Sequence, residues 1–284
     1  MITKCLFPVA GYGTRFLPAT KSMPKEMLPI VNKPLVQYGV EEAIDAGLTE
    51  IGFVTGRGKR AIADHFDVNY ELEHQIQGTG KEKYLECIRS VMERGVFSFT
   101  RQTAMRGLGD AILTGERLMG DQPFGVVLSD DLCFGEIPSG KSNGADEGVM
   151  AQMVKLYNEF HCCIVAIQEV PRDQLEKFGV IAGVEIRPSL YRVSNMVEKP
   201  KPADAPSNLA IIGRYILTPE IFDVLRKTPP GKNGEVQITD ALMTLAKEDK
   251  VLAYKFKGRR FDCGSVDGFV EATNFCYKNI YKPV

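Results

Sequence analysis

The chain has 284 residues, 44% of them hydrophobic, so it can bury a large core without a disulfide or a structural metal. Its 35 basic residues are balanced by 36 acidic ones, and the net charge of −1 argues against a nucleic-acid-binding surface, which normally carries a clear basic excess. The seven cysteines show no C-x-x-C spacing, no signal peptide is present and no apolar run approaches ~18 residues; we therefore expect a cytoplasmic protein without zinc motifs or membrane spans.

The N-terminal part of the chain predicts a β-α-β unit. An apolar strand over Ile2–Ala10 leads into a loop rich in glycine and proline. Apolar residues on one helical stripe then predict a helix that begins at Leu35 and ends at Gly47, and a second strand follows over Ile51–Thr55. Strand, helix and strand in this order imply a parallel sheet with a right-handed crossover.

The α/β pattern continues along the chain and then changes to closely spaced strands. Helices are predicted at 61–65, 69–94, 111–119, 150–160, 219–227, 236–247 and 266–281. Strands are predicted at 97–101, 124–129, 162–170, 180–186, 191–197, 209–217 and 251–256. We expect a single α/β domain over residues 1–284: a Rossmann-like, three-layer, mixed and mainly parallel sheet, a small antiparallel β addition, and a C-terminal helical segment at 266–284.

The segment Leu6–Ile30 is the most distinctive part of the sequence. It joins the end of the first strand to a glycine-rich loop that carries the cations Arg15, Lys21 and Lys25. An apolar strand that leads into such a loop brings backbone N–H groups close to a phosphate chain. Prolines at positions 18, 24 and 29 oppose helix formation, so a stiff, extended phosphate-binding loop is predicted.

The sequence contains one partial and one complete match to familiar nucleotide-binding patterns, and neither has the structural context that its pattern requires. Gly11–Phe16 begins like a dinucleotide fingerprint, but Phe16 replaces the third glycine and Pro18 opposes the helix that should follow. Residues 135–142 satisfy the P-loop pattern, but the preceding strand has already ended and Pro138 lies inside the loop. We interpret the second match as a solvent loop.

Asp130 and Asp131 directly follow a buried strand, where the carboxyl ends of parallel strands form a ligand crevice. Adjacent residues point to opposite sides, so at most one of the two is expected to meet a metal. Magnesium commonly takes one or two carboxylates and completes its shell with phosphate oxygens and water. A turn with two solvated acids is the alternative.

Taken alone, Asp262 before the last helix indicates a capping turn, and Glu198–Lys199 indicates a surface pair.

Taken together, motifs along nearly the whole chain resemble those of the bacterial UTP–glucose-1-phosphate uridylyltransferases, which belong to the sugar-nucleotidyltransferase family. These motifs lie at 8–30, 54–62, 102, 107–109, 128–132, 178–180, 197–200, 212–215, 234–240 and 261–264. The resemblance implies a nucleotide-diphospho-sugar transferase fold and the reaction of UTP with glucose 1-phosphate to give UDP-glucose and pyrophosphate, with Mg²⁺ as cofactor. It also suggests a homodimer or homotetramer with the C-terminal helix at an interface.

The resemblance assigns roles to individual residues. Arg15 and Lys25 would bind the triphosphate and Lys199 the phosphates on the sugar side, so these three would be catalytic. Asp130 and Asp262 would hold magnesium. The nucleotide contacts, with the uracil at the backbone of residues 10–11 and at positions 102 and 107, would come from Ala10, Gly11, Gly13, Thr14, Gln102, Gly107 and Asp130. The sugar contacts would come from Gly179, Glu198 and Gly213.

Two other functions stay open at this point. Thymidylyltransferase relatives tend to carry Gly-Asp-Asn at the metal strand, whereas this chain has Ser-Asp-Asp at 129–131, which favours the uridylyl branch. A catalytically silent paralogue would be free to lose its phosphate and metal groups, yet Lys25, Asp130, Lys199 and Asp262 are all present. Glucose 1-phosphate and galactose 1-phosphate both stay open as the sugar substrate.

Overall fold

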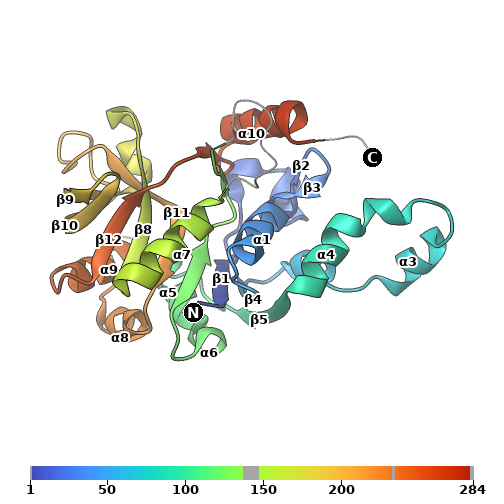
Figure 1. Cartoon of the computed structure of the whole chain (residues 1–284), viewed down its shortest axis with the longest axis horizontal. Helices are drawn as coiled ribbons and strands as arrows, with labels where there is room; N and C mark the ends of the chain where they lie inside the picture. Colours follow the sequence, from blue (N-terminus) through green and yellow to red (C-terminus); the bar gives the residue numbers. More distant parts are fainter. Residues whose placement is uncertain (1, 137–146, 232–233, 282–284) are drawn as a thin grey trace.

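The computed structural model describes residues 2–136, 147–231 and 234–281. Its centre is a nine-stranded sheet with the order β5-β4-β1-β6-β11-β8-β12-β10-β9 (Figure 1). The strands are β1 (Lys4–Pro8), β4 (Glu50–Thr55), β5 (Val96–Arg101), β6 (Phe124–Val127), β8 (Cys163–Glu169), β9 (Gly179–Arg187), β10 (Leu190–Glu198), β11 (Leu209–Leu217) and β12 (Val251–Lys255).

The sheet is mixed, as predicted. Strands β5, β4, β1 and β6 run parallel to one another. Strand β11 is antiparallel to both β6 and β8, and β10 is antiparallel to β12 and β9. The antiparallel strands predicted as an addition therefore continue the same sheet.

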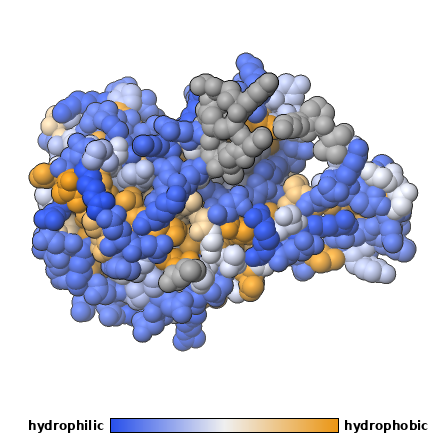
Figure 2. Space-filling model, viewed as in Figure 1, coloured by the Kyte–Doolittle hydropathy of each residue, from blue (hydrophilic) through white to orange (hydrophobic). Residues whose placement is uncertain are grey.

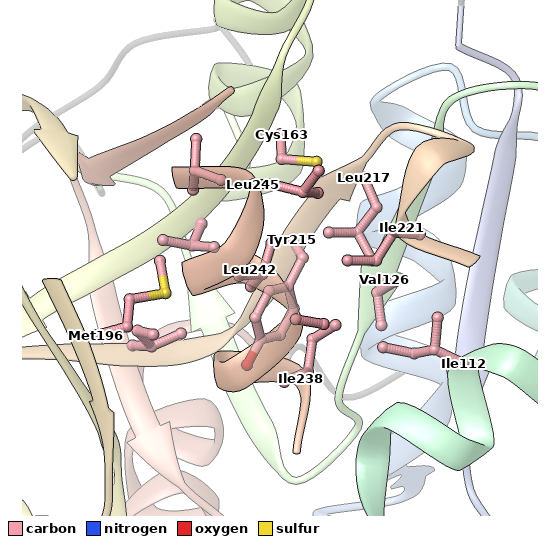
Figure 3. Packing of buried hydrophobic residues seen from close by; sticks show 14 of the residues in the cluster. Ile112, Val126, Cys163, Met196, Tyr215, Leu217, Ile221, Ile238, Leu242 and Leu245 are labelled. Carbon is pink, nitrogen blue, oxygen red and sulfur yellow. The ribbon is translucent and has the colours of Figure 1, made fainter. Parts of the chain in front are cut away.

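Helices cover both faces of the sheet and give the expected three layers. One face carries α1 (Leu35–Asp45), α2 (Arg60–His65), α4 (Glu86–Arg94) and α7 (Val149–Phe160). The other face carries α5 (Gly107–Thr114), α6 (Glu116–Met119), α8 (Glu220–Lys227) and α9 (Ile238–Ala246). Strand β1 explains the arrangement, because Leu6 belongs to one core cluster while Cys5 and Phe7 belong to the other, and all three are fully buried. Figure 3 shows the α5, α8 and α9 side, where Ile221 and Leu242 belong to the same buried cluster as residues of the sheet.

A two-stranded ribbon of β7 (Asp131–Phe134) and β13 (Arg259–Asp262) was not predicted. The two strands pair antiparallel, with Asp262 opposite Asp131. Each is only four residues long and carries charged side chains, so neither shows the apolar alternation that identifies a strand. Helix α10 (Val266–Asn279) packs near this ribbon in a third apolar cluster, which includes Ile30 of the short β2 (Pro29–Ile30) beside β3 (Lys33–Pro34).

Three local predictions need correction. The loop after β1 is not extended but forms three short 3-10 turns, η1 (Thr14–Phe16), η2 (Ala19–Lys21) and η3 (Lys25–Met27), because proline excludes a long helix but tolerates a single tight turn.

The helix predicted at 111–119 is two helices, α5 and α6, that meet at Gly115, where a Cβ would lie 2.6 Å from Leu6 Cδ1. The helix predicted at 69–94 is α3 (Tyr70–Ile76), η4 (Glu82–Tyr84) and α4, interrupted where Gly78 and Gly80 take positive φ. A further 3-10 segment is η5 (Arg172–Lys177).

Three further observations concern the molecular surface, possible membrane spans and the P-loop match. On the face shown in Figure 2 hydrophilic residues predominate, with hydrophobic ones visible in patches between them. Among the residues with a described position, no helix is both long and apolar enough to cross a membrane. The P-loop match at 135–142 has its residues from 137 onward outside the described part of the chain.

Candidate active site

The carboxyl ends of the parallel strands lie side by side and carry most of the predicted site residues. The loop after β1, Gln102 after β5 and Asp130 after β6 all start at this edge of the sheet. A cavity of about 630 Å³ lies beside it, and the predicted residues that line it are Arg15, Gly107, Asp130, Gly179, Glu198, Lys199, Gly213 and Asp262. A second cavity of about 1360 Å³ lies against α1 and α7. We place the site in the smaller cavity, because the larger one is not lined by any of the predicted site residues, all of which have described positions.

Lys25 and Asp130 form an ion pair at this edge. Lys25 Nζ donates to Asp130 Oδ2 at 2.6 Å. Burial favours the neutral form of each group, but the pairing outweighs it, so the pKa of Lys25 lies above and that of Asp130 below its ordinary value. Gly13, in a left-handed conformation with φ 67°, makes the approach possible, because a Cβ there would lie 2.8 Å from Lys25 Cβ.

The carboxylates of Asp130 and Asp262 converge on Gly264. A Cβ built on Gly264 would lie 3.0 Å from Asp262 Oδ1, 3.3 Å from Asp130 Oδ2 and 3.3 Å from a guanidinium nitrogen of Arg15. Glycine at this position therefore allows two acids and one cation to approach a common point. In the described ranges, no group of three or more His, Cys, Asp or Glu residues could hold a metal ion by itself. Two convergent carboxylates fit a divalent metal that takes its other ligands from phosphate and water.

Asp131, the first residue of β7, is buried and makes different contacts from Asp130. Its Oδ2 accepts the backbone N–H of Gly213 at 2.7 Å, and its Oδ1 accepts from Arg260 of β13. Arg260 also stacks on the ring of Phe178, with 5.0 Å between the guanidinium carbon and the ring centre. Asp131 thus joins the ribbon to Gly213, one of the predicted sugar contacts, and this connection was not predicted from the sequence.

Two of the predicted sugar contacts are paired with each other, Gly179 at the start of β9 and Glu198 at the end of β10, while Gly213 lies in β11. Glu198 Oε2 accepts from the hydroxyl of Thr239 on α9 at 3.1 Å, and Lys199 Nζ lies 3.3 Å from Glu198 Oε1. A Cβ on Gly179 would lie 2.6 Å from Thr239 Cγ2, so this position has no room for a side chain. Lys199 takes a positive φ of 46°, and its backbone N–H donates to Phe178 O at 2.9 Å. A lysine in this strained conformation at a cavity edge is typical of a functional position.

Gln102 and Gly107 meet at the other end of the edge. Gln102 Nε2 donates to Asp110 Oδ2 at 2.7 Å and to Gly107 O at 3.4 Å. Gly107 has a φ of 92°, and a Cβ there would lie 2.9 Å from Val236 O. The segment that leads into α9 therefore packs tightly against Gly107. Gln102 and Asp110 are both buried.

The remaining predicted nucleotide contacts lie at the end of β1. Ala10 is buried and Gly11 exposed, and a Cβ on Gly11 would have nothing within 4 Å. Thr14 begins η1. Only Arg15 of the loop lines the cavity; Lys25 reaches its wall through Asp130, and Gln102 through Gly107.

A buried ion pair behind the loop was also missed. Lys59, at the start of α2, donates to Glu26 Oε2 at 2.6 Å, and the two side chains are 6% and 2% exposed. Glu26 is next to Lys25, so this pair fixes the turn that carries Lys25. In the sequence Lys59 directly follows the glycine-rich end of a predicted strand, which marks it as a candidate functional residue. Its partner Glu26 lies 33 residues away, so the pair itself has no signature in the sequence.

Comparison with known proteins gives consistent matches over nearly the whole chain. Residues 8–279 match the model of the nucleotidyl transferase family. The chain is 66% identical over 282 residues to a UTP–glucose-1-phosphate uridylyltransferase of Pseudomonas aeruginosa, a match that covers 99% of this chain and 98% of that one. Among solved structures, an apo UDP-glucose pyrophosphorylase aligns with a TM-score of 0.92 at 56% identity, covering 99% of this chain and 100% of that one. A UDP-glucose pyrophosphorylase complexed with UDP-glucose aligns with a TM-score of 0.88 at 54% identity, covering 98% and 99%.

Proposed function

The chain belongs to the nucleotidyl transferase family and, within it, to the UTP–glucose-1-phosphate uridylyltransferases, and we propose that the cavity beside Asp130 is where it transfers a uridylyl group from UTP to glucose 1-phosphate. The products are UDP-glucose and pyrophosphate. The transfer is a direct, in-line attack on the α-phosphorus of UTP without a covalent intermediate.

The observation that carries this assignment of the site is the convergence of Arg15, Asp130 and Asp262 on Gly264. One cation and two carboxylates at a common point suit a metal-bound phosphate chain better than they suit a neutral ligand. The ion pair between Lys25 and Asp130 adds a second cation to the same place.

The chemistry needs charge neutralisation more than proton transfer. The attacking oxygen belongs to a phosphate and is already an anion, so no general base is required. The main barrier is the repulsion between two polyanions, UTP and the sugar phosphate. Arg15 and Lys25 would neutralise the triphosphate, and Lys199 would neutralise the phosphates on the sugar side. Each would stabilise the charge that spreads over the α-phosphate in the transition state.

The other residues would bind and orient the substrates. Glu198, oriented by Thr239, would accept hydrogen bonds from sugar hydroxyls. Gly179 and Gly213 leave room beside it, since side chains there would meet Thr239 and Asp131. At the other end, Gln102 and the backbone at Ala10, Gly11, Gly13, Thr14 and Gly107 would hold the nucleotide.

Nucleotidyl transferases generally use a divalent metal, and we propose Mg²⁺ here, held by Asp130 and Asp262 together with phosphate oxygens and water. A magnesium ion bound there supplies positive charge to the α-phosphate of UTP. The donor set fits, because it consists of hard oxygen ligands only.

A substrate panel tests the proposed function. Purified protein should release pyrophosphate from UTP and glucose 1-phosphate with Mg²⁺, and should lose this activity when EDTA replaces the metal. Turnover with dTTP at or above the UTP rate would favour a thymidylyltransferase, and no metal-dependent turnover with any pair would favour a silent paralogue. Galactose 1-phosphate in the same panel decides between the two sugars.

We further propose a cytoplasmic homodimer or homotetramer with α10 at an interface. Each of the seven cysteines, all within the described ranges, is a free thiol, which suits a reducing compartment. On α10, Val266, Val270 and Tyr277 are 54%, 53% and 64% exposed and lie on one helical stripe. Light scattering should give two or four chains for the parent and fewer for Val270→Glu.

A further inference from the structure

We propose that Asp110 is a positioning residue that selects uracil over cytosine, because it fixes which end of the Gln102 side-chain amide faces the base. This inference rests on the proposed function, in which Gln102 and Gly107 meet the nucleotide base. It concerns a residue that lines no part of the cavity and acts only through Gln102.

The hydrogen bonds around Gln102 determine the orientation of its amide. Both acceptors of Nε2, the Asp110 carboxylate at 2.7 Å and the carbonyl of Gly107 at 3.4 Å, have no hydrogen to donate. Rotating the amide by 180° would place Oε1 against two acceptors. The contact with a charged carboxylate is also the stronger kind of hydrogen bond.

The two carboxylate oxygens of Asp110 have different partners. Its Oδ1 accepts from Arg106 Nε at 3.1 Å, while Oδ2 faces Gln102. Asp110 is 8% exposed and Gln102 is 4% exposed, so water competes little for the hydrogen bond between them. Helix α5 begins at Gly107, so Asp110 lies in its first turn, where a negative charge is favourable.

Oε1 of Gln102 is the part of the amide left to meet a ligand. It accepts no hydrogen bond from any residue in the described part of the chain. Among the described residues, the fully buried side-chain nitrogen or oxygen atom that lacks a hydrogen-bond partner is Ser129 Oγ. Gln102 Oε1 also lacks a partner, so it is not fully buried and is reachable from solvent. The amide therefore presents an acceptor, and not a donor, to whatever binds.

An acceptor at this position distinguishes the two pyrimidines. Uracil carries a hydrogen on N3 and can donate it to Oε1, whereas N3 of cytosine is itself an acceptor. A site that presents one hydrogen-bonding sense rejects a ligand of the opposite sense, because buried polar groups would be left unpaired. 5-Methyluracil keeps the N3 hydrogen, so Asp110 should not affect its use relative to uracil.

The experiment measures kcat/KM for UTP, CTP and 5-methyl-UTP with the parent, Asp110→Asn and Asp110→Ala. Asparagine has the same shape, but its amide can donate to a rotated Gln102, so both orientations become available. We expect the preference for UTP over CTP to fall by about tenfold or more, mainly through a higher KM for UTP. The preference for UTP over 5-methyl-UTP should stay unchanged.

Arg106→Met serves as the matched control, since it removes the ion pair of Asp110 but leaves the contact with Gln102. It should keep the preference for UTP over CTP. The proposal is overturned if folded Asp110→Asn keeps the parental preference, or if it loses activity equally with all three nucleotides. A parent protein that uses none of them would count against the proposed function instead, and equilibrium binding of UTP and CTP to the same variants would then test Asp110 on its own.

Discussion

Lys25 Nζ lies 2.6 Å from Asp130 Oδ2, although 105 residues separate the two in sequence. The pair joins the loop after β1 to the end of β6, and thereby joins a predicted triphosphate contact to a predicted metal ligand. The contact places the positive charge of Lys25 against Asp130. In the proposed function the same lysine would also neutralise the phosphates of UTP, so we expect Lys25 to compete with a metal ion for Asp130.

Lys25→Met should therefore tighten the binding of a divalent cation to the free protein. Removing a charge-assisted hydrogen bond of ~1.5–3 kcal/mol leaves Asp130 without a competing cation, so affinity for Mn²⁺ should rise by about ten- to a hundredfold. Titration calorimetry with Mn²⁺ in the absence of nucleotide measures this directly. Lys33→Met, which breaks the ion pair with Glu41 instead, is the control and should not change Mn²⁺ affinity. Unchanged affinity in Lys25→Met would contradict the competition.

Lys199→Ala and Asp130→Asn should each lower kcat by about 10²–10³, the range for losing one preorganised electrostatic group. The proposed reason is that Lys199 neutralises the sugar-side phosphates and Asp130 holds the metal. Pyrophosphate release at saturating substrate is the measurement. Lys199→Arg keeps the positive charge and should retain more turnover than the alanine variant. Near-normal turnover by Lys199→Ala or Asp130→Asn would refute the role given to that residue.

The elements that the sequence predicted well share one property, a long apolar pattern. Strand β1 and helix α1 are such cases, and their positions differ from the prediction only at the ends. The ribbon of β7 and β13 lacks that pattern, because its stability comes from pairing between segments far apart in the chain. Short strands of this kind are recognised only when the partner is known.

Contacts between distant segments were also the part of the site that the sequence did not reveal. Lys25, Asp130 and Asp262 were proposed from motifs, and the structure brings all three to one edge of the sheet. The side chains that orient such residues were missed, because a carboxylate such as Asp110 has no distinctive spacing to the glutamine that it holds. Pairing between distant segments determines these contacts, and a single sequence does not reveal it.

His65 should make the stability of the chain sensitive to acid. Its ring is half-buried, with Nε2 2.9 Å from Gln37 Oε1, and burial lowers the pKa of His65 below its ordinary value of 6.5. The unfolded chain therefore takes up a proton at this residue before the folded one does. The contribution of neutral His65 to stability is present above pH 6.5 and is lost as the pH falls below it.

Urea unfolding at pH 8 and pH 5 tests this sign. The parent should lose more stability over this interval than His65→Gln, which cannot take up a proton but can still donate to Gln37. An equal loss in the two proteins would show that His65 does not contribute to the pH dependence.

The buried pair of Glu26 and Lys59 should be costly to break from one side. Burial raises the pKa of Glu26 and lowers that of Lys59, so each charge depends on the other for its stability. Lys59→Met leaves a buried carboxylate without its partner and should lower the free energy of unfolding by roughly 3–5 kcal/mol. It should also lower kcat, because Glu26 holds the turn that carries Lys25.

The double variant Glu26→Gln with Lys59→Met removes both charges and should recover most of the lost stability, since an uncharged replacement of a buried ion pair is often close to neutral. Urea unfolding of the parent, both single variants and the double variant gives the coupling energy. Arg60→Ala, which breaks the exposed pair with Asp64, should change stability by less than ~1 kcal/mol. If the double variant is as unstable as Lys59→Met, the loss comes from packing around Lys59 and not from an unpaired charge on Glu26.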